Sequence, residues 1–379
     1  MTDFLLNLFS TEGVLIGTIV PFLIVLGVVV FVHEMGHYLV GRWCGIGVQA
    51  FSIGFGPELF GFHDRRGTRW KLSAIPLGGY VKFTGDMAVT SAPDSEATAK
   101  LSLEERKVAF HTQPVWKRAA TVFAGPLFNF ILTAVVFAVM FSTNGKFVSE
   151  PMVAEVNPGS PAEIAGFQPG DRFISLDGNR VTTFSDVQRY VSARAGDEIL
   201  FVVFRDGQEV ELIATPEVYE QTDPLGGTVK IGLIGVRNDE SLGQPRIIEF
   251  GPLEAIGEAI YETGYVIVRT GHFLQRFVAG REDKCQLGGP VKIADMAGKA
   301  AKRGVEWLVQ LTALLSVGIG FLNLLPIPPL DGGHLVFYGY EAVARKKPSE
   351  RVMEFFYRIG LFLVLAFMVF VFWNDIFGC

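Results

Sequence analysis

The amino-acid sequence predicts a polytopic α-helical membrane protein, with a domain of strands and short helices inserted between its second and third membrane spans. Composition is the first reason, because 49% of the 379 residues are apolar and 19% are charged, whereas a soluble domain carries about 25% charged residues. The apolar residues also gather into runs long enough to cross a bilayer. Between two of these runs, a long stretch alternates short apolar segments with turn residues, which is typical of strands.

Four membrane spans are expected from length and charge. A helix needs about 20 apolar residues to cross the hydrocarbon core. The first three runs contain no charged residue, and the fourth is shorter and borrows the aromatic residues Phe355, Phe356 and Tyr357 that precede it. The runs cover residues 14–32, 119–141, 308–330 and 359–373.

The positions of Lys and Arg predict the orientation of these spans. Basic residues are frequent between the first and second runs and in the link between the third and fourth, while the first thirteen residues carry none. Cytosolic loops carry an excess of Lys and Arg, so both termini and the stretch 142–305 are expected outside the cytosol. Residues 253–278 carry glutamates on one helical face and predict an amphipathic helix on the outer membrane face; a fifth span is the alternative.

The first run ends in a metal-binding pattern, His33-Glu34-Met35-Gly36-His37. Residues four apart share a helix face, so both imidazoles can bind one zinc ion. Glu34 then projects near the open coordination position, where it can take a proton from water whose pKa the metal lowers. The alternative is a helix end at which these side chains simply reach water. Ionisable residues at membrane depth are, however, costly and usually functional.

A catalytic zinc ion needs a third protein ligand and one open position. The best candidate is Asp331, which directly follows the third apolar run in a segment with three prolines. A carboxylate at the end of a charge-free span needs a partner, and prolines stop a regular helix there. An exposed aspartate in a turn is the alternative. His334 is a competing ligand that we rank as merely near the metal.

The two motifs together resemble the site-2 protease family, of the M50 type, and within it the bacterial RseP-like proteases of regulated intramembrane proteolysis. The resemblance rests on the zinc pattern of the first span and on Asn323-Leu324-Leu325-Pro326 with Leu330-Asp331-Gly332 near the third. Gly125-Pro126-Leu127-Phe128-Asn129-Phe130 is similar to the family's motif in the second span. The resemblance to this protease family covers essentially the whole chain.

The resemblance implies roles for individual residues. His33, His37 and Asp331 would bind zinc, and Glu34 would be the general base. Asn323 and Pro326 would lie beside the substrate backbone. The segment Gly54-Phe55-Gly56-Pro57 resembles the family's re-entrant β segment, whose edge could pair with an unwound substrate because a helical substrate hides its amides. An ordinary cytosolic loop is the alternative for this segment.

The inserted stretch resembles a PDZ domain. The run from Gly159 to Phe167, followed by Gly170 and Asp171, carries the match. Strands are expected at 152–156, 172–176, 199–204 and 209–214, with helices at 161–165 and 185–193. Such a domain binds the C-terminus of a peptide by strand addition; a steric cap without a ligand is equally compatible. The best-known relatives carry two PDZ domains, and this chain has room for one.

These observations predict a zinc-dependent intramembrane endopeptidase of the bacterial inner membrane, with the PDZ region in the periplasm. Its partners would be the lipid bilayer and single-span substrates held with an extended backbone after a first cut outside, and the family resemblance implies substrates of the anti-sigma-factor or remnant-signal-peptide type. Alternatives are a membrane-anchored zincin that acts on soluble or misfolded proteins, and a non-catalytic metal-binding scaffold. The net charge of −6 without a basic stripe argues against a nucleic-acid partner.

The chain is accordingly expected to divide into seven parts. These are a first transmembrane helix at 1–40, a cytosolic loop with the re-entrant segment at 41–114, a second transmembrane helix at 115–142, the PDZ region at 143–245, the interfacial segment at 246–304, a third transmembrane helix at 305–335, and a cytosolic link with the fourth at 336–379.

Overall fold

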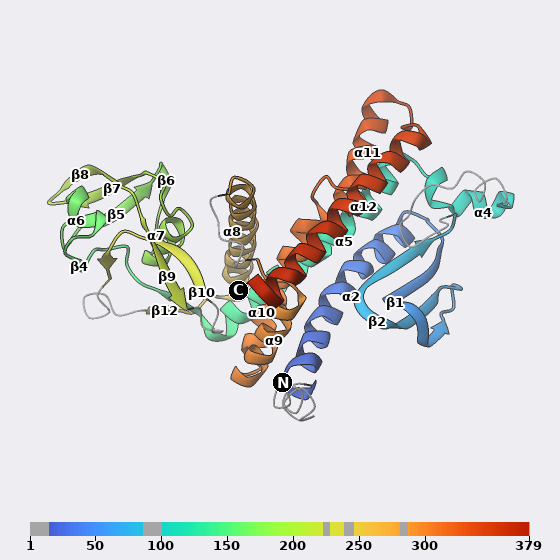
Figure 1. Ribbon diagram of the computed structural model, residues 1–379, viewed down its shortest axis with the longest axis horizontal. Coiled ribbons are helices and arrows are strands. Elements are labelled where there is room, and N and C mark those ends of the chain that lie inside the picture. Colours follow the sequence, from blue (N-terminus) through green and yellow to red (C-terminus); the bar gives the residue numbers. More distant parts are fainter. Residues whose placement is uncertain (1–14, 86–100, 223–227, 239–245, 281–286, 379) are drawn as a thin grey trace. The chain divides into compact units, whose positions relative to one another are not determined.

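The computed structural model describes residues 15–85, 101–222, 228–238, 246–280 and 287–378 (Figure 1). The chain forms two compact units. The first comprises Met1–Phe137, Glu262–Ile267 and Gly288–Cys379, and the second comprises Ala138–Tyr261 and Val268–Leu287.

Four described helices are long and apolar enough to cross a membrane, which confirms the expected number of spans and makes the chain a multi-pass membrane protein. They are Gly17–Trp43, Val115–Asn144, Val305–Asn323 and Arg351–Phe377. Their regular α-helical parts are α2 (Val20–Trp43), α5 (Val115–Asn144), α10 (Val305–Asn323) and α12 (Glu350–Trp373), with short π-helical turns, η1 (Leu15–Ile19) and η4 (Asn374–Gly378), at two ends. Helix α8 (Pro252–Val278), the candidate for a fifth span, is not among them.

The third span ends earlier than the sequence suggested. Helix α10 stops at Asn323, whereas the charge-free run continues to residue 330. Proline lacks a backbone N–H and its ring clashes with the preceding turn, so residues 324–330, which hold three prolines, cannot extend the helix. A new helix, α11 (Asp331–Ala344), begins at Asp331.

A β-hairpin packs against α2 in the first unit (Figure 1). Strands β1 (Val48–His63) and β2 (Arg69–Phe83) are antiparallel and form a sheet of two strands with several register shifts. Buried aromatic residues from the hairpin and from neighbouring helices, including Phe51, Phe83 and Phe110, share one core. Helix α4 (Leu103–Val108), the 3₁₀ turn η2 (Phe110–Thr112) and helix α9 (Pro290–Arg303) complete this unit.

Helices α2 and α5 approach each other closely at Gly36. A Cβ atom there would lie 2.3 Å from the carbonyl oxygen of Ala124. Small residues allow such backbone contact between membrane helices. This contact places the α2 face that carries His33 and His37 against α5.

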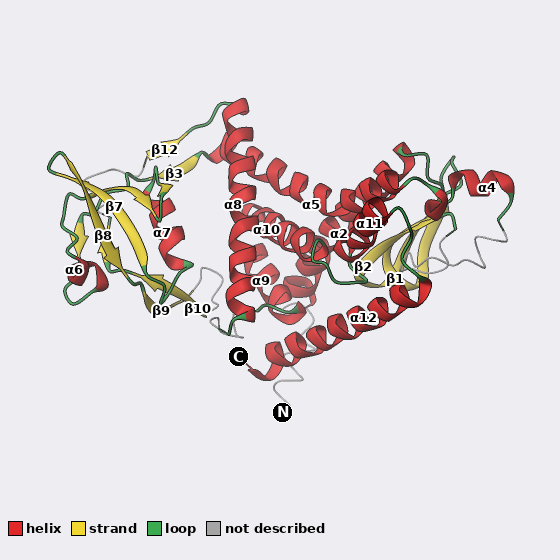
Figure 2. Ribbon diagram, turned by 90° about the horizontal axis from the view of Figure 1, so that it is seen from above, coloured by secondary structure: helices red, strands yellow, loops and turns green. Residues whose placement is uncertain are grey.

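The second unit is rich in strands (Figure 2). Its main sheet has the order β6-β5-β7-β8, and Phe173 and Phe201 are buried in its core. The strands of this sheet are β5 (Arg172–Leu176), β6 (Asn179–Arg180), β7 (Ile199–Arg205) and β8 (Gln208–Ala214). Two helices, α6 (Pro161–Ala165) and α7 (Phe184–Ser192), accompany it. Three short pairs join β3 (Lys146–Val148) to β12 (Arg246–Ile248), β4 (Glu155–Val156) to β11 (Val236–Arg237), and β9 (Glu217–Thr222) to β10 (Thr228–Leu233).

Most of the expected strands and helices of this unit occur at or near the residues assigned from sequence. Helix α6 and strand β5 have the expected bounds. The strand expected from Met152 is reduced to Glu155–Val156, and Met152 itself forms only an isolated bridge to Arg172. Strands β9 to β12 were not expected, because their apolar pattern is weak and interrupted.

Candidate metal centre

Two imidazoles from α2 form one side of the candidate metal site. His33 and His37 lie one helical turn apart, and their Nε2 atoms are 3.2 Å apart. Both side chains are buried. The other nitrogen of His37, Nδ1, donates a hydrogen bond to the backbone oxygen of Thr121 at 2.9 Å. This bond leaves Nε2 of His37 as the nitrogen that can bind a metal.

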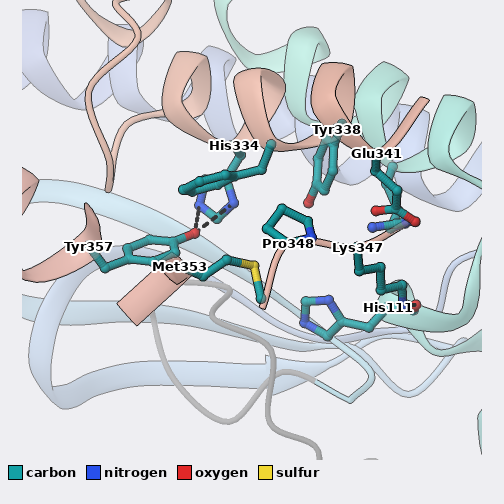
Figure 3. A pocket seen from close by; sticks show the side chains of 10 residues that line it. His111, His334, Tyr338, Glu341, Lys347, Pro348, Met353 and Tyr357 are labelled. Carbon is teal, nitrogen blue, oxygen red and sulfur yellow. Dashed lines mark hydrogen bonds and ion pairs between the residues drawn. The ribbon is translucent and has the colours of Figure 1, made fainter. Parts of the chain in front are cut away.

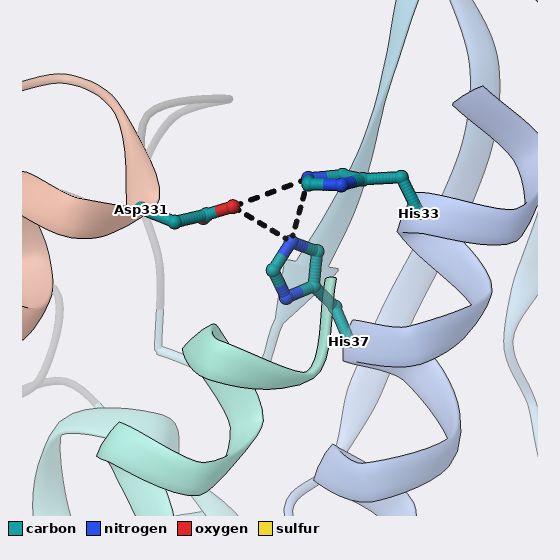
Figure 4. A group of neighbouring side chains, drawn as sticks. All are labelled: His33, His37 and Asp331. Carbon is teal, nitrogen blue, oxygen red and sulfur yellow. Dashed lines mark hydrogen bonds and ion pairs between the residues drawn. The ribbon is translucent and has the colours of Figure 1, made fainter. Parts of the chain in front are cut away.

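Asp331 completes the group from the first residue of α11 (Figure 4). Its Oδ2 atom lies 3.2 Å from Nε2 of His33 and 3.5 Å from Nε2 of His37. This atom is buried, and no described group makes a hydrogen bond of acceptable geometry with it. The three residues are brought together as predicted from sequence.

The arrangement of the three atoms suits zinc. Tetrahedral coordination with bonds of about 2.0–2.1 Å places ligand atoms about 3.3 Å apart, and the three observed separations are 3.2, 3.2 and 3.5 Å. Two imidazole nitrogens and one carboxylate oxygen are also a usual ligand set for catalytic zinc. The chain thus provides three candidate ligands, and a tetrahedral site would keep a fourth position for water or substrate.

Glu34 lines the same cavity as the three candidate ligands. The cavity has a volume of about 290 Å³, and Glu34 is buried in its wall. Val81 of strand β2 lines the same cavity as Glu34. Strand β2 can approach so closely because residue 79 is glycine; a Cβ atom there would lie 2.9 Å from Cγ of Glu34.

The structure separates the remaining predicted site residues into two groups. Phe55 and Asn323 line the cavity beside the candidate ligands. Gly54, Gly56 and Pro326 are not among its lining residues. Gly54 and Gly56 have positive φ angles of 89° and 83°, so they shape the hairpin, and Pro326 belongs to the irregular segment before α11.

Sequence reasoning missed the part of the hairpin that faces the metal ligands. Gly79, Tyr80 and Val81 of β2 line the cavity, whereas the expectation centred on Gly54–Gly56 of β1. The adjacent glycines 78 and 79 were the available signal, since strand glycines mark close backbone approach.

His334 lines both the cavity of the candidate metal ligands and a smaller second cavity, and Figure 3 shows it in the wall of the second. The Tyr357 hydroxyl is 2.9 Å from each of its ring nitrogens. The second cavity, of about 60 Å³, is also lined by Arg118 and Glu341, which form a buried ion pair at 2.7 Å. His334 is not one of the three clustered ligand candidates.

Comparison with known proteins agrees with this geometry. The family model described as Peptidase family M50 matches residues 21–367. A protein of Mesorhizobium japonicum, named a putative zinc metalloprotease, is 72% identical over 96% of this chain and 100% of its own length. One of Brucella suis with the same description is 63% identical over the whole of both chains. Metalloprotease MmpA of Caulobacter vibrioides is 41% identical over 94% of this chain and 95% of its own.

Among solved structures, the PDZ domain of the SdrC-like protein from Listeria monocytogenes matches 26% of this chain and 93% of its own length. The sequence identity is 17% and the TM-score is 0.19.

Proposed function

This chain belongs to peptidase family M50, and we propose that it is a zinc metalloprotease that hydrolyses peptide bonds of other membrane proteins at the depth of the bilayer. One observation carries the proposal. The three candidate ligand atoms lie within 4.8 Å of one another, and two of them come from a helix apolar enough to span a membrane. A metal held by that helix lies where a substrate span would pass.

The proposed roles follow from the chemistry of each group. Zinc, held by His33, His37 and Asp331, would supply Lewis acidity and lower the pKa of a water molecule. The Glu34 carboxylate accepts the proton of the attacking water and passes it to the leaving amine. The close approach of β2 at Gly79, where a Cβ atom would lie 2.9 Å from Cγ of Glu34, keeps the carboxylate against the cavity wall.

Substrate binding requires an extended backbone, because every amide of a membrane helix is already hydrogen-bonded within the helix. The β1–β2 sheet has two strands, so each strand has an unpaired edge. We propose that β2 residues Gly79–Val81, with Phe55, accept an unwound substrate segment by strand addition. The Asn323 side-chain amide, in the same cavity, would hold the substrate backbone on the other side.

The strand-rich unit is proposed to be a PDZ domain on the periplasmic side of the bacterial inner membrane. The candidate metal ligands, Glu34 and Asn323 all belong to the first unit, so the strand-rich unit is not required for the chemistry. It would act either by excluding substrates with bulky outer domains or by binding the C-terminus that a first cut creates. Deleting it separates the two roles. If the unit excludes bulky substrates, the deletion variant should cleave untrimmed substrate. If the unit binds the new C-terminus, the deletion variant should cleave trimmed substrate more slowly than the full-length enzyme.

The experiment that tests the proposed function measures zinc content and cleavage together, in the full-length enzyme reconstituted with a single-span substrate. We expect Glu34→Gln to retain zinc and lose cleavage, and Asp331→Ala to lose both, because the base and the ligands are separate groups. Mass spectrometry of the products locates the cut. A cut inside the substrate span supports the proposal, whereas cleavage only in soluble segments favours the membrane-anchored zincin. Full zinc and full activity in Asp331→Ala would refute the ligand assignment.

A further inference from the structure

We propose that Asn129 on α5 positions the imidazole of His33 by accepting a hydrogen bond from its Nδ1–H, so that Nε2 is presented to the metal. The inference rests on the proposed function, because it takes His33 to be a zinc ligand. It assigns a role to the second-span motif at residues 125–130, which the proposed catalytic roles leave without one.

The contact between the two side chains is close and buried. Asn129 is 0% exposed, and its Nδ2 atom lies 3.3 Å from Nδ1 of His33. Its Oδ1 atom is buried and has no hydrogen-bond partner among the described residues. A buried amide oxygen without a donor is unfavourable, because it has lost its hydrogen bonds to water. The Asn129 side chain, which contacts the His33 ring, therefore has an oxygen, Oδ1, that can accept a further hydrogen bond.

The tautomer required for zinc binding supplies the missing donor. Nε2 of His33 faces Asp331 and His37 at 3.2 Å, so it is the nitrogen that would bind zinc. A neutral imidazole that binds through Nε2 carries its proton on Nδ1. A half-turn of the Asn129 amide exchanges Nδ2 and Oδ1 in place, and Oδ1 then accepts that proton. The exchange pairs the amide oxygen with the imidazole proton, as usual for metal-binding histidines, and turns Nδ2 to the place that Oδ1 occupied.

The neighbouring ligand is held in the same way from the same helix face. The backbone oxygen of Thr121 accepts from Nδ1 of His37 at 2.9 Å. Thr121, Gly125 and Asn129 are spaced four residues apart, so they follow one another along one face of α5. Gly125 lies between the two acceptors, where a Cβ atom would be 2.3 Å from Nε2 of His37. This face of α5 thus fits both imidazoles.

The backbone of Asn129 is itself fixed against α10. Ser316 Oγ donates to the backbone oxygen of Asn129 at 2.9 Å, and Thr133 Oγ1, one turn further along α5, donates to the backbone oxygen of Ala313 at 2.8 Å. Both hydroxyls are buried. These bonds keep the Asn129 side chain at the depth of the His33 ring.

Chelator competition on the full-length enzyme in detergent tests the role of the acceptor. Asn129→Leu removes it, and we expect zinc affinity to fall about 10- to 100-fold, as for other partners of metal ligands. Asn129→Asp has the same shape and accepts only, so its affinity should stay within a few-fold of wild type. Thr312→Val is the matched control, because it removes a side-chain hydrogen bond within the spanning helix α10, from Thr312 Oγ1 to the backbone oxygen of Leu308, that touches neither Asn129 nor an imidazole. Its zinc affinity should equal that of wild type.

The same measurements can overturn the inference. Wild-type zinc affinity in Asn129→Leu, or an affinity in Asn129→Asp as low as in Asn129→Leu, would mean that Asn129 only fills space. If Asn129→Leu does not fold, nitrogen NMR of ¹⁵N-histidine-labelled, zinc-loaded wild type decides. We expect the His33 proton on Nδ1, and a proton on Nε2 would refute the inference. His33→Ala separates the two proposals. Full zinc binding in His33→Ala refutes the ligand assignment itself, whereas zinc loss there with full binding in Asn129→Leu refutes only the role of Asn129.

Discussion

Replacing Gly125 by alanine is the smallest change that should disable the metal site. A Cβ atom at residue 125 would lie 2.3 Å from Nε2 and 2.4 Å from Cε1 of His37, and 2.9 Å from Cε1 of His33. Ordinary contact begins near 3.4 Å, so the His37 ring must move by about 1.1 Å (3.4 − 2.3). Zinc sites tolerate errors in bond length of about 0.2 Å. The ring also cannot retreat without losing its hydrogen bond to the backbone oxygen of Thr121.

The effect on zinc should exceed the effect on folding. Overpacking costs about 1–3 kcal/mol, but alanine gains about 0.8–1.0 kcal/mol over glycine inside a helix. We therefore expect modest destabilisation of the metal-free protein. Zinc affinity should fall at least 10- to 100-fold, the range for disturbed partners of metal ligands.

Isothermal calorimetry or chelator competition measures the zinc affinity, and thermal unfolding without metal measures the stability. Gly27→Ala is the control, because Gly27 also lies within a spanning helix but a Cβ atom there meets nothing within 4 Å. It should bind zinc as wild type does. Zinc affinity and cleavage within threefold of wild type in Gly125→Ala would refute the reasoning.

Three further predictions concern stability, pH and topology. Arg118→Leu leaves the Glu341 carboxylate without its buried partner at 2.7 Å, so the free energy of unfolding should fall by about 3–5 kcal/mol. The double variant Arg118→Leu, Glu341→Leu should recover much of that loss, and an equal loss of unfolding free energy in the single and double variants would contradict this prediction. Partial burial raises the pKa of Asp64, but hydrogen bonds from Trp70, from the backbone of Thr68 and Arg66, and from Tyr38 outweigh it and lower that pKa from 3.8 to about 2. A lowered folded-state pKa adds stability above pH 3.8 that is lost as the pH falls toward 2, so thermal unfolding in that interval should be more pH-dependent in wild type than in Asp64→Asn; identical pH profiles would count against it. For topology, Ile164 and Val343 are 82% and 88% exposed. With native cysteines replaced by serine, an impermeant thiol reagent on intact cells should label Ile164→Cys and not Val343→Cys, and the opposite pattern would invert the proposed orientation. The buried Cys44 is unsuitable, and Cys285 and Cys379 lie outside the described residues.

The grouping of the three candidate metal ligands could be predicted from sequence by simple physical rules. Helical periodicity alone places His33 and His37 on one face. Asp331 is remote, but a carboxylate beside a charge-free span needs a partner, and this requirement pointed to the metal. The bounds of α6 and β5 were predicted equally well, since capping and turn residues mark them.

The surroundings of the ligands could not be predicted because they depend on contacts between distant segments. Nothing in the local sequence says that a Cβ at Gly125 would meet His37, or that Gly79 lets β2 reach Glu34. The register of β1 and β2 is irregular at several positions, so alternation could not identify the residues that face the cavity. The charge-free run overstated the length of α10, because residues 324–330 are still apolar, whereas the prolines among them stop the helix, as the sequence also indicated.

The candidate ligands lie so far apart along the chain that the metal site cannot assemble until most of the chain has been synthesised. His33 and His37 lie in the first spanning helix, whereas Asp331 opens a helix near the other end. At about 5–20 residues per second, the ribosome needs about 15–60 s to make the 298 residues (331 − 33) that separate them. Until then, only two of the three candidate ligands exist. A nascent chain that lacks Asp331 therefore cannot form the complete candidate metal site.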